Sequence, residues 1–156
     1  MKVKILKIAD NELPKYQTEG ASGMDVTAAN IEPVTIYPGA RVKIPLGFVL
    51  EIPEGWEAQL RSRSGLTFTS GIVVANGVGT IDSDYRGEVS VVLHNITKDS
   101  VFTVVHGMKV AQLVFAEVEK VVLEEVTKLS NTIRSTGGFG STDIRQSILP
   151  GMVDFI

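Results

Sequence analysis

The chain contains no cysteine among its 156 residues, and only 6% of the residues are aromatic. Without cysteine it can form neither disulfides nor thiolate metal sites, which favours a reducing compartment. No apolar run approaches the roughly 20 residues of a membrane-spanning helix. Met1–Ala9 alternates lysine with apolar residues and lacks the continuous apolar core of a signal peptide. We therefore expect a cytoplasmic protein with no membrane partner.

Basic residues are also too few for a broad nucleic-acid-binding surface. The 15 Lys and Arg residues face 18 Asp and Glu residues, and the net charge is −3. Contacts between cationic side chains and phosphates dominate affinity for DNA and RNA, so no nucleic-acid partner is expected. A local basic pocket for one phosphorylated small molecule remains compatible with this charge. The length suits a single domain with a substantial core.

Short apolar and β-branched runs, separated by Pro and Gly turns, make up most of the chain. Turn signals recur roughly every eight to twelve residues, a pattern typical of an all-β sandwich or barrel. Asn11–Gly20 is expected to be a surface loop, and one helical turn is expected within Arg61–Thr67. The expected strands are Val3–Ile8, Val34–Tyr37, Arg41–Ile44, Phe48–Ile52, Trp56–Leu60, Ser100–Val104, Met108–Glu119 and Val121–Val126.

The stretch Gly71–Leu93 carries the densest set of reactive side chains. Its apolar runs Ile72–Val74 and Val89–Leu93 flank a glycine-rich, polar centre, which predicts a β-hairpin. Within five residues of that centre stand two carboxylates, a phenol and a guanidinium, at Asp82, Asp84, Tyr85 and Arg86. A turn needs no such set, so the hairpin is a candidate site.

Five segments stand out along the chain: Ala21–Asp25 (ASGMD), Arg63–Leu66 (RSGL), Gly79–Gly87 (GTIDSDYRG), Gly107–Leu113 (GMKVAQL) and Arg134–Thr142 (RSTGGFGST). In this order and at this spacing they resemble the five motifs of the trimeric dUTP diphosphatase (dUTPase) family. One of them alone would be weak evidence, but all five in order make a chance match very improbable.

The resemblance implies an all-β, jelly-roll (β-clip-like) protomer with at most one short helix and a flexible C-terminal arm. Residues 1–130 would form the β domain, and residues 131–156 the glycine-rich arm with an extension, for which no role is assigned. Three such protomers would form a homotrimer whose active sites lie between subunits. The implied reaction is the hydrolysis of dUTP to dUMP and pyrophosphate, which keeps uracil out of DNA and supplies dUMP for dTMP synthesis.

In the family, the Asp of the first motif, here Asp25, orients water on a Mg²⁺ ion that rides on the triphosphate. Because Mg²⁺ keeps several waters, one carboxylate acting through water suffices, and no dense cluster of ligands is required. Arg63, Ser64 and Gly65 of the second motif supply donors for phosphate oxygens. Seen alone, Asp25 is equally well a turn residue that caps a strand, and Arg63–Gly65 a solvated surface turn.

The third motif implies that Asp82 is the general base, which activates the water that attacks the α-phosphorus. Asp84 is then a structural carboxylate. Asp82 and Asp84 would share one face of a strand and are an alternative metal pair, but no third ligand is evident. Tyr85 resembles the residue whose ring lies under the deoxyribose and leaves no room for a 2′-hydroxyl. Without the motif, Tyr85 would be ordinary hairpin packing.

Asn76 matches a family residue in the pocket that reads uracil. Its carboxamide supplies a donor and an acceptor, as does the base edge, and backbone groups of the hairpin (candidates Gly79, Thr80 and Ile81) can read the rest. Cytosine would present the opposite pattern and leave buried groups unpaired.

The last two motifs add Gln112, as a phosphate or inter-subunit hydrogen-bonding group, and Arg134, at the γ-phosphate. In the tail, Phe139 would stack over uracil, and the glycine-rich backbone around Gly140 and Ser141 would approach the substrate when the arm closes. Two departures from the family stand out. Ser62 replaces the usual Pro before Arg63, and Met108-Lys109 replaces the usual acidic–basic pair.

Two other functions remain as alternatives. A dCTP deaminase of the same fold would have a catalytic Glu ten residues after the motif Asp, where this chain has Val92, and Pro-Gly where it has Ser83-Asp84. A binding or regulatory trimer without catalysis is the other. His94 and His106 fall at no position that the chemistry needs.

Overall fold

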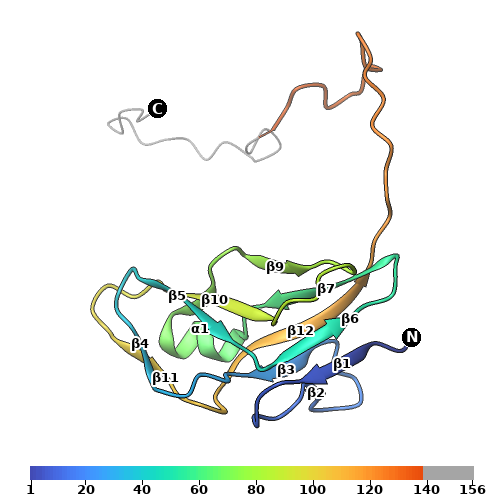
Figure 1. Ribbon diagram of the computed structural model, residues 1–156. Helices are drawn as coiled ribbons and strands as arrows, with labels where there is room; N and C mark the ends of the chain where they lie inside the picture. Colours follow the sequence, from blue (N-terminus) through green and yellow to red (C-terminus); the bar gives the residue numbers. More distant parts are fainter. Residues whose placement is uncertain (139–156) are drawn as a thin grey trace, which may run out of the picture. The chain divides into compact units, whose positions relative to one another are not determined.

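The computed structural model describes residues 1–138, which form twelve strands and one short helix, α1 (Ser64–Ser70). The expectation of an all-β fold with at most one short helix is confirmed for this part of the chain (Figure 1). The strands are β1 (Lys4–Lys7), β2 (Lys15–Tyr16), β3 (Met24–Thr27), β4 (Val34–Ile36), β5 (Arg41–Pro45), β6 (Phe48–Glu51), β7 (Trp56–Arg61), β8 (Ile72–Val74), β9 (Val78–Ile81), β10 (Ser90–Asn95), β11 (Phe102–Val104) and β12 (Lys109–Glu117).

A five-stranded antiparallel sheet, in the order β2-β3-β12-β7-β9, carries the predicted site residues Asp25, Gly79–Ile81 and Gln112. Its register places Asp25 opposite Gln112, Gln112 opposite Arg61, and Arg61 opposite Val78. These four residues therefore form one row across the sheet. Because partners in register point to the same face, Asp25 and Gln112 share a face, while the next row, which includes Leu60 and Leu113, points to the core.

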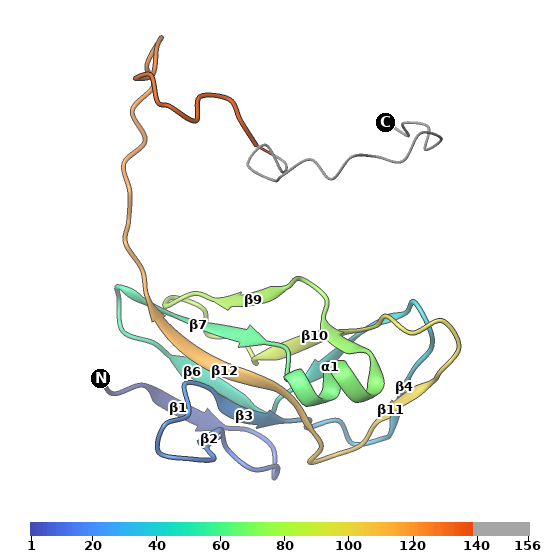
Figure 2. The ribbon, with the colours of Figure 1, turned by 180° about the vertical axis from the view of Figure 1, so that it is seen from behind.

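Three smaller sheets complete the fold: β5-β10-β8, β1-β6 and β11-β4 (Figures 1 and 2). β10 shows why these segments form strands, since its inward residues alternate with partly exposed ones. Val91 and Leu93 are buried apolar residues of this strand. Asn95, also fully buried, donates to the carbonyls of Ile36 (2.9 Å) and Ser100 (2.7 Å). A buried amide held in this way locks the strand end without leaving its donors unpaired.

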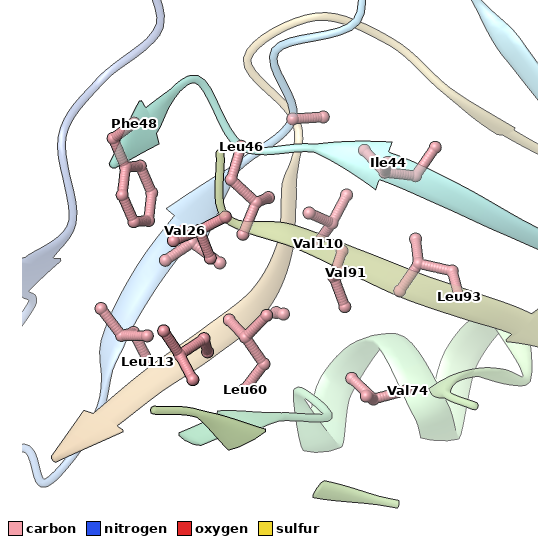
Figure 3. Packing of buried hydrophobic residues seen from close by; sticks show 14 of the residues in the cluster. Val26, Ile44, Leu46, Phe48, Leu60, Val74, Val91, Leu93, Val110 and Leu113 are labelled. Carbon is pink, nitrogen blue, oxygen red and sulfur yellow. The ribbon is translucent and has the colours of Figure 1, made fainter. Parts of the chain in front are cut away.

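One apolar core lies between the sheets, and both large sheets contribute to it (Figure 3). Val26 and Leu113 come from the five-stranded sheet, and Ile44 and Leu93 from the three-stranded sheet. The charged site residues Asp25, Arg63 and Asp82 lie outside this core.

The stretch Gly71–Leu93 is more than the hairpin that its pattern predicts. Its apolar runs do pair, with Leu93 opposite Val74. The segment between them contains an extra strand, β9, which pairs with β7 in the other sheet. The polar centre therefore crosses from one sheet to the other and back.

Three further expectations differ from the structure. The helix begins at Ser64, not near Arg61, because Arg61 is still paired in β7 and Arg63 is extended (φ −87°, ψ 125°). The expected loop Asn11–Gly20 contains the two-residue strand β2. The strand expected at Val121–Val126 is wrong: this segment has no strand hydrogen bonds, because no other part of the described chain pairs with it.

The chain divides into two compact units, and the first, Met1–Lys120, contains all the strands and the helix of the described residues. The second begins at Val121. Its described part, residues 121–138, contains the strongly exposed apolar side chains Val122, Leu123, Leu129 and Ile133. Within the described residues, no helix combines the length and the apolar character needed to cross a membrane.

Candidate functional site

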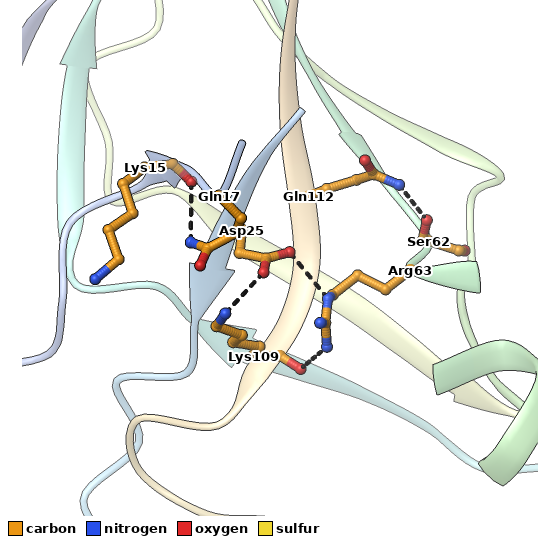
Figure 4. A network of polar contacts seen from close by, with 7 residues as sticks. All are labelled: Lys15, Gln17, Asp25, Ser62, Arg63, Lys109 and Gln112. Carbon is orange, nitrogen blue, oxygen red and sulfur yellow. Dashed lines mark hydrogen bonds and ion pairs between the residues drawn. The ribbon is translucent and has the colours of Figure 1, made fainter. Parts of the chain in front are cut away.

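Asp25, Arg63 and Lys109 form an ion-pair cluster beside strands β3 and β12 of the five-stranded sheet (Figure 4). One carboxylate oxygen of Asp25 accepts from the Arg63 Nε at 3.0 Å, and the other lies 3.0 Å from the Lys109 Nζ. The Arg63 guanidinium also donates to the backbone carbonyl of Lys109 at 3.2 Å. Three segments far apart in the sequence are thereby tied together.

Gln112 and Ser62 hold the framework of this cluster. The Gln112 amide donates to the Ser62 carbonyl at 2.9 Å, and the Ser62 hydroxyl accepts from the Val74 backbone N–H at 2.9 Å. Gly23 lies so close to the Gln112 side chain that any Cβ at this position would overlap the amide oxygen. A larger residue at this position of the first motif would therefore displace the Gln112 amide from its place.

The cluster carries a net positive charge and is partly open to solvent. The side chain of Asp25 is 16% exposed, against 32% for Arg63 and 38% for Lys109. A nearby pair adds no further net charge, since the Lys15 ammonium lies 2.9 Å from the Glu12 carboxylate. That contact with Lys15, with a smaller effect of Lys109, lowers the pKa of Glu12. Two cations around one half-buried carboxylate make a surface that suits an anionic ligand.

A metal held only by protein ligands does not fit the described residues. Nowhere in residues 1–138 do three His, Cys, Asp or Glu side chains gather as a metal site would need. The alternative of a metal held jointly by Asp82 and Asp84 therefore finds no third ligand there. A Mg²⁺ ion that keeps its waters and touches a single carboxylate through them does fit, and Asp25 is the carboxylate that the cluster offers.

A second group of predicted residues lies along β9 and the loop after it. Asn76, Gly79, Thr80 and Ile81 line a hollow of about 90 Å³ between β9 and β10. A Cβ at Gly79 would stand 3.4 Å from the Asn76 amide nitrogen and 3.3 Å from the Leu60 Cβ. Glycine at this position thus lets the exposed carboxamide of Asn76 lie close to the strand backbone.

Asp82 and Tyr85 line an adjoining hollow of about 260 Å³, which shares Thr80, Ile81 and Ser90 with the first. The Tyr85 hydroxyl donates to the Glu88 carbonyl at 3.1 Å, and its ring packs against Gly87, where a Cβ would overlap the ring. Both Asp82 and Tyr85 are exposed. Carboxamide, phenol ring and carboxylate therefore follow one another along one continuous surface.

Asp25 and Asp82, at the far ends of the two groups, lie far apart within one chain. From the row of Asp25, three strand spacings lead to β9, about 14 Å in all, and four residues along β9 add about 13 Å. Asp82 therefore lies about 20 Å from Asp25, measured between backbones across the sheet. Asp84 lines a third hollow, of about 640 Å³, together with Asp82, Trp56 and Lys120.

The predicted residues of the C-terminal motif are only partly described. Arg134 belongs to the second unit, where its Nε donates to the Gly137 carbonyl at 2.8 Å. Phe139, Gly140 and Ser141 lie outside the described residues, as does the extension. The two histidines lie away from both groups: His106 pairs with Asp10 at 3.1 Å, and His94 lies on β10.

Residues 9–143 match the family model described as dUTPase. The chain belongs to the dUTPase family. A curated relative, the deoxyuridine 5'-triphosphate nucleotidohydrolase of Rhizobium johnstonii, is 47% identical over 147 residues, which cover 91% of this chain and 94% of the relative.

Solved dUTPase structures share the fold of this chain. A mutant dUTPase of Staphylococcus bacteriophage 80alpha, solved with dUpNHpp, superposes with a TM-score of 0.83 at 22% identity, covering 92% of this chain and 99% of that one. A mutant dUTPase from phage phi11 of S. aureus, solved to show the coordination of a structural Mg(II) ion, gives 0.74 at 21% identity, covering 84% and 100%. The expected all-β, jelly-roll fold of the dUTPases is confirmed.

Lys109, in the ion-pair cluster around Asp25, and Ser62, in its hydrogen-bonded framework, were not among the predicted site residues. Lys109 lies at a departure from the fourth motif, and its ammonium binds Asp25 directly. Ser62 replaces the usual Pro before Arg63, and it joins β7, β8 and β12 through two hydrogen bonds. The signal for both was their place beside motif residues, but the sequence alone does not give the partner of either side chain.

Proposed function

We propose that this dUTPase-family chain hydrolyses dUTP to dUMP and pyrophosphate. The observation that carries the proposal is the family match over residues 9–143, which includes the residues of both groups described above. In the cell, such an enzyme would act in the cytoplasm, keeping uracil out of DNA and supplying dUMP for dTMP synthesis.

The triphosphate is assigned to the cluster at Arg63. Its guanidinium, the Ser64 hydroxyl and the Gly65 N–H are donors that gain strength against charged phosphate oxygens. Ser64 and Gly65 are exposed at the start of α1, so they are free to meet a ligand. Gln112, held by Ser62, keeps the loop before Arg63 in place. Arg134 would add a further cation at the γ-phosphate, with Phe139, Gly140 and Ser141 closing over the substrate.

The nucleoside is assigned to the surface along β9. Asn76 and the backbone of Gly79–Ile81 would read the uracil edge, and the ring of Tyr85 would lie under the deoxyribose. Asp82, next along the same surface, would take a proton from water as it attacks the α-phosphorus in line with the leaving pyrophosphate. A Mg²⁺ ion bound with the triphosphate would supply Lewis-acid stabilisation of the negative charge. Asp25 would hold its waters.

A homotrimer with sites between subunits is the assembly that we propose. The span of about 20 Å between Asp25 and Asp82 is much longer than a triphosphate, so one chain cannot offer both groups to one substrate. The exposed apolar residues Val122 and Leu123, which are 95% and 91% exposed in the isolated chain, support burial against another subunit.

The test of the mechanism is Asp82→Asn. This change keeps the shape of the side chain but removes the base, so turnover should fall by about 10²-fold or more while nucleotide binding is kept. Pyrophosphate release measures turnover, and calorimetry with a non-hydrolysable dUTP analogue measures nucleotide binding. Asp84→Asn is the matched control and should retain near-normal turnover, because Asp84 is assigned no chemical step.

Near-normal activity of Asp82→Asn would overturn the assignment of the base. Substrate identity is tested by comparing dUTP, dCTP, dTTP and UTP with the unaltered protein. Equal rates for all four would contradict the uracil and deoxyribose readers, and release of ammonia from dCTP would favour the deaminase. Binding of dUTP without turnover would favour the regulatory trimer.

A further inference from the structure

Lys109 is the charged residue of the Asp25 cluster to which the proposed reaction gives no task. Its ammonium lies 3.0 Å from one oxygen of Asp25, while Arg63 binds the other oxygen at 3.0 Å. Figure 4 shows the two cations approaching the carboxylate from different segments, Lys109 from β12 and Arg63 from the turn after β7. Asp25 thus has no oxygen that is not already paired with a positive charge.

This arrangement is unfavourable for a free divalent cation. The local charge of Asp25, Arg63 and Lys109 together is positive, and the nearest further pair, Glu12 with Lys15, is neutral. A hydrated metal that approaches Asp25 would have to displace the Lys109 ammonium and would then face that unpaired cation beside the Arg63 guanidinium. The same charges attract a triphosphate, which carries several negative charges in a compact group.

We propose that Lys109 is a positioning residue that closes Asp25 to divalent metal until a nucleotide triphosphate arrives. Phosphate oxygens then draw the ammonium away, and the freed oxygen of Asp25 meets the waters of the metal that the triphosphate brings. Lys109 exchanges one anionic partner for another, with no covalent step. The inference rests on the proposed function, since it assumes that Asp25 serves a metal bound with dUTP.

The contacts of Lys109 make its ammonium separable from the rest of the cluster. Arg63 is held by the backbone carbonyl of Lys109, at 3.2 Å, and not by its side chain. The pair between Arg63 and Asp25 is also independent of the ammonium. Replacing the Lys109 side chain therefore uncovers one oxygen of Asp25 and leaves the guanidinium in place.

The experiment is Mn²⁺ binding without nucleotide, followed by electron paramagnetic resonance of the free ion. Lys109→Gln should bind Mn²⁺ on the order of tenfold more tightly than the unaltered protein, as expected when a unit charge a few ångström from a divalent cation is removed. Lys109→Arg keeps the charge and should bind Mn²⁺ as weakly as the unaltered protein. Lys98→Gln, a matched change at an exposed lysine outside the cluster, should also leave binding unchanged.

Adding Asp25→Asn to Lys109→Gln should abolish the gain, which assigns it to this carboxylate. Equal Mn²⁺ affinity of Lys109→Gln and the unaltered protein would overturn the proposal, as would tighter binding by Lys109→Arg. Thermal melting checks that each variant is folded.

A second measurement needs no substitution. The unaltered protein should bind Mn²⁺ much more tightly when a non-hydrolysable dUTP analogue is present than when it is absent, beyond the affinity of the analogue itself for the ion. Equally tight binding at Asp25 without nucleotide would contradict a closed carboxylate. The Mn²⁺ titrations without nucleotide involve no turnover. A failure to hydrolyse dUTP would therefore refute the proposed function, but those titrations would still test whether Lys109 blocks metal binding at Asp25.

Discussion

Gly87 sets the position of the Tyr85 ring in the proposed nucleoside surface. The ring of Tyr85 rests where a Cβ of residue 87 would stand, and its hydroxyl is fixed to the Glu88 carbonyl at 3.1 Å. The lack of a side chain at Gly87 therefore determines where the Tyr85 ring lies. Such a contact is invisible in the sequence motif, which shows only that a glycine follows Tyr85 and Arg86.

Gly87→Ala should displace the Tyr85 ring and so weaken the exclusion of a 2′-hydroxyl. We expect the ratio of kcat/KM for dUTP to that for UTP to fall by about tenfold or more, as a shift of the ring worth about 1.4 kcal/mol would give. Gly20→Ala is the control, because a Cβ there has no atom within 4 Å. An unchanged ratio in Gly87→Ala would argue against Tyr85 as the sugar gate.

The helix α1 ends at a glycine that no other residue replaces without strain. Gly71 is left-handed (φ 61°, ψ 29°), its N–H donates to the Thr67 carbonyl, and a Cβ would stand 2.5 Å from the Thr97 Cγ2. Gly71 joins helix α1 to strand β8. It therefore fixes the direction of the chain between the residues proposed to bind the triphosphate and those proposed to bind the nucleoside.

Gly71→Ala should lower the free energy of unfolding by about 1–2 kcal/mol from backbone strain alone, and by more if Thr97 cannot move. Gly65→Ala, in the same helix but in open space, should be neutral or stabilising by up to about 1 kcal/mol. Urea denaturation of the two variants beside the unaltered protein measures both effects. A Gly71→Ala protein as stable as the Gly65→Ala protein would contradict this account of the cap.

For the secondary-structure elements, the sequence predicted the bounds of those strands that are set by Pro and Gly turns. β5, β6 and β7 lie within one residue of their expected bounds, because Pro and Gly mark the turns between them. What the sequence missed depends on partners: β9 has only four residues and exists because β7 offers it an edge. Val121–Val126 shows the reverse, since its β-branched run is a strand pattern that finds no partner among the described residues.

The same limit applies to the candidate site. The motifs identified Asp25, Arg63 and Gln112, and the structure brings these three segments together. That the Lys109 ammonium completes the cluster depends on the register of β12 against β3, which contains a bulge between Lys109 and Ala111. No local pattern predicts such a shift.

For the whole molecule, the separation of the two groups predicts that inactive variants repair each other. Arg63→Ala and Asp82→Asn should each be inactive alone, but a shared site takes Arg63 from one subunit and Asp82 from another. In trimers mixed at random from equal amounts, about a quarter of the sites should combine two intact halves. Co-expression with two affinity tags and tandem purification would isolate the mixed trimers for a pyrophosphate assay.

Two differently tagged copies of Asp82→Asn, purified in the same way, should stay inactive. Mixed assemblies of the two variants with no recovered activity would show that each site is built within one chain. A monomeric mass of the active protein would exclude shared sites directly.

The distance from Asp25 to Asp82 along the sheet has a consequence for how the protein responds to dilution and to mutation. If each site spans two chains, a newly folded single chain is inert, and turnover per chain should decline when the concentration falls below the dissociation constant of the assembly. Substitutions on contact surfaces far from any reacting atom would then reduce catalysis as severely as changes at Asp82. The enzyme would then become active only when its chains associate.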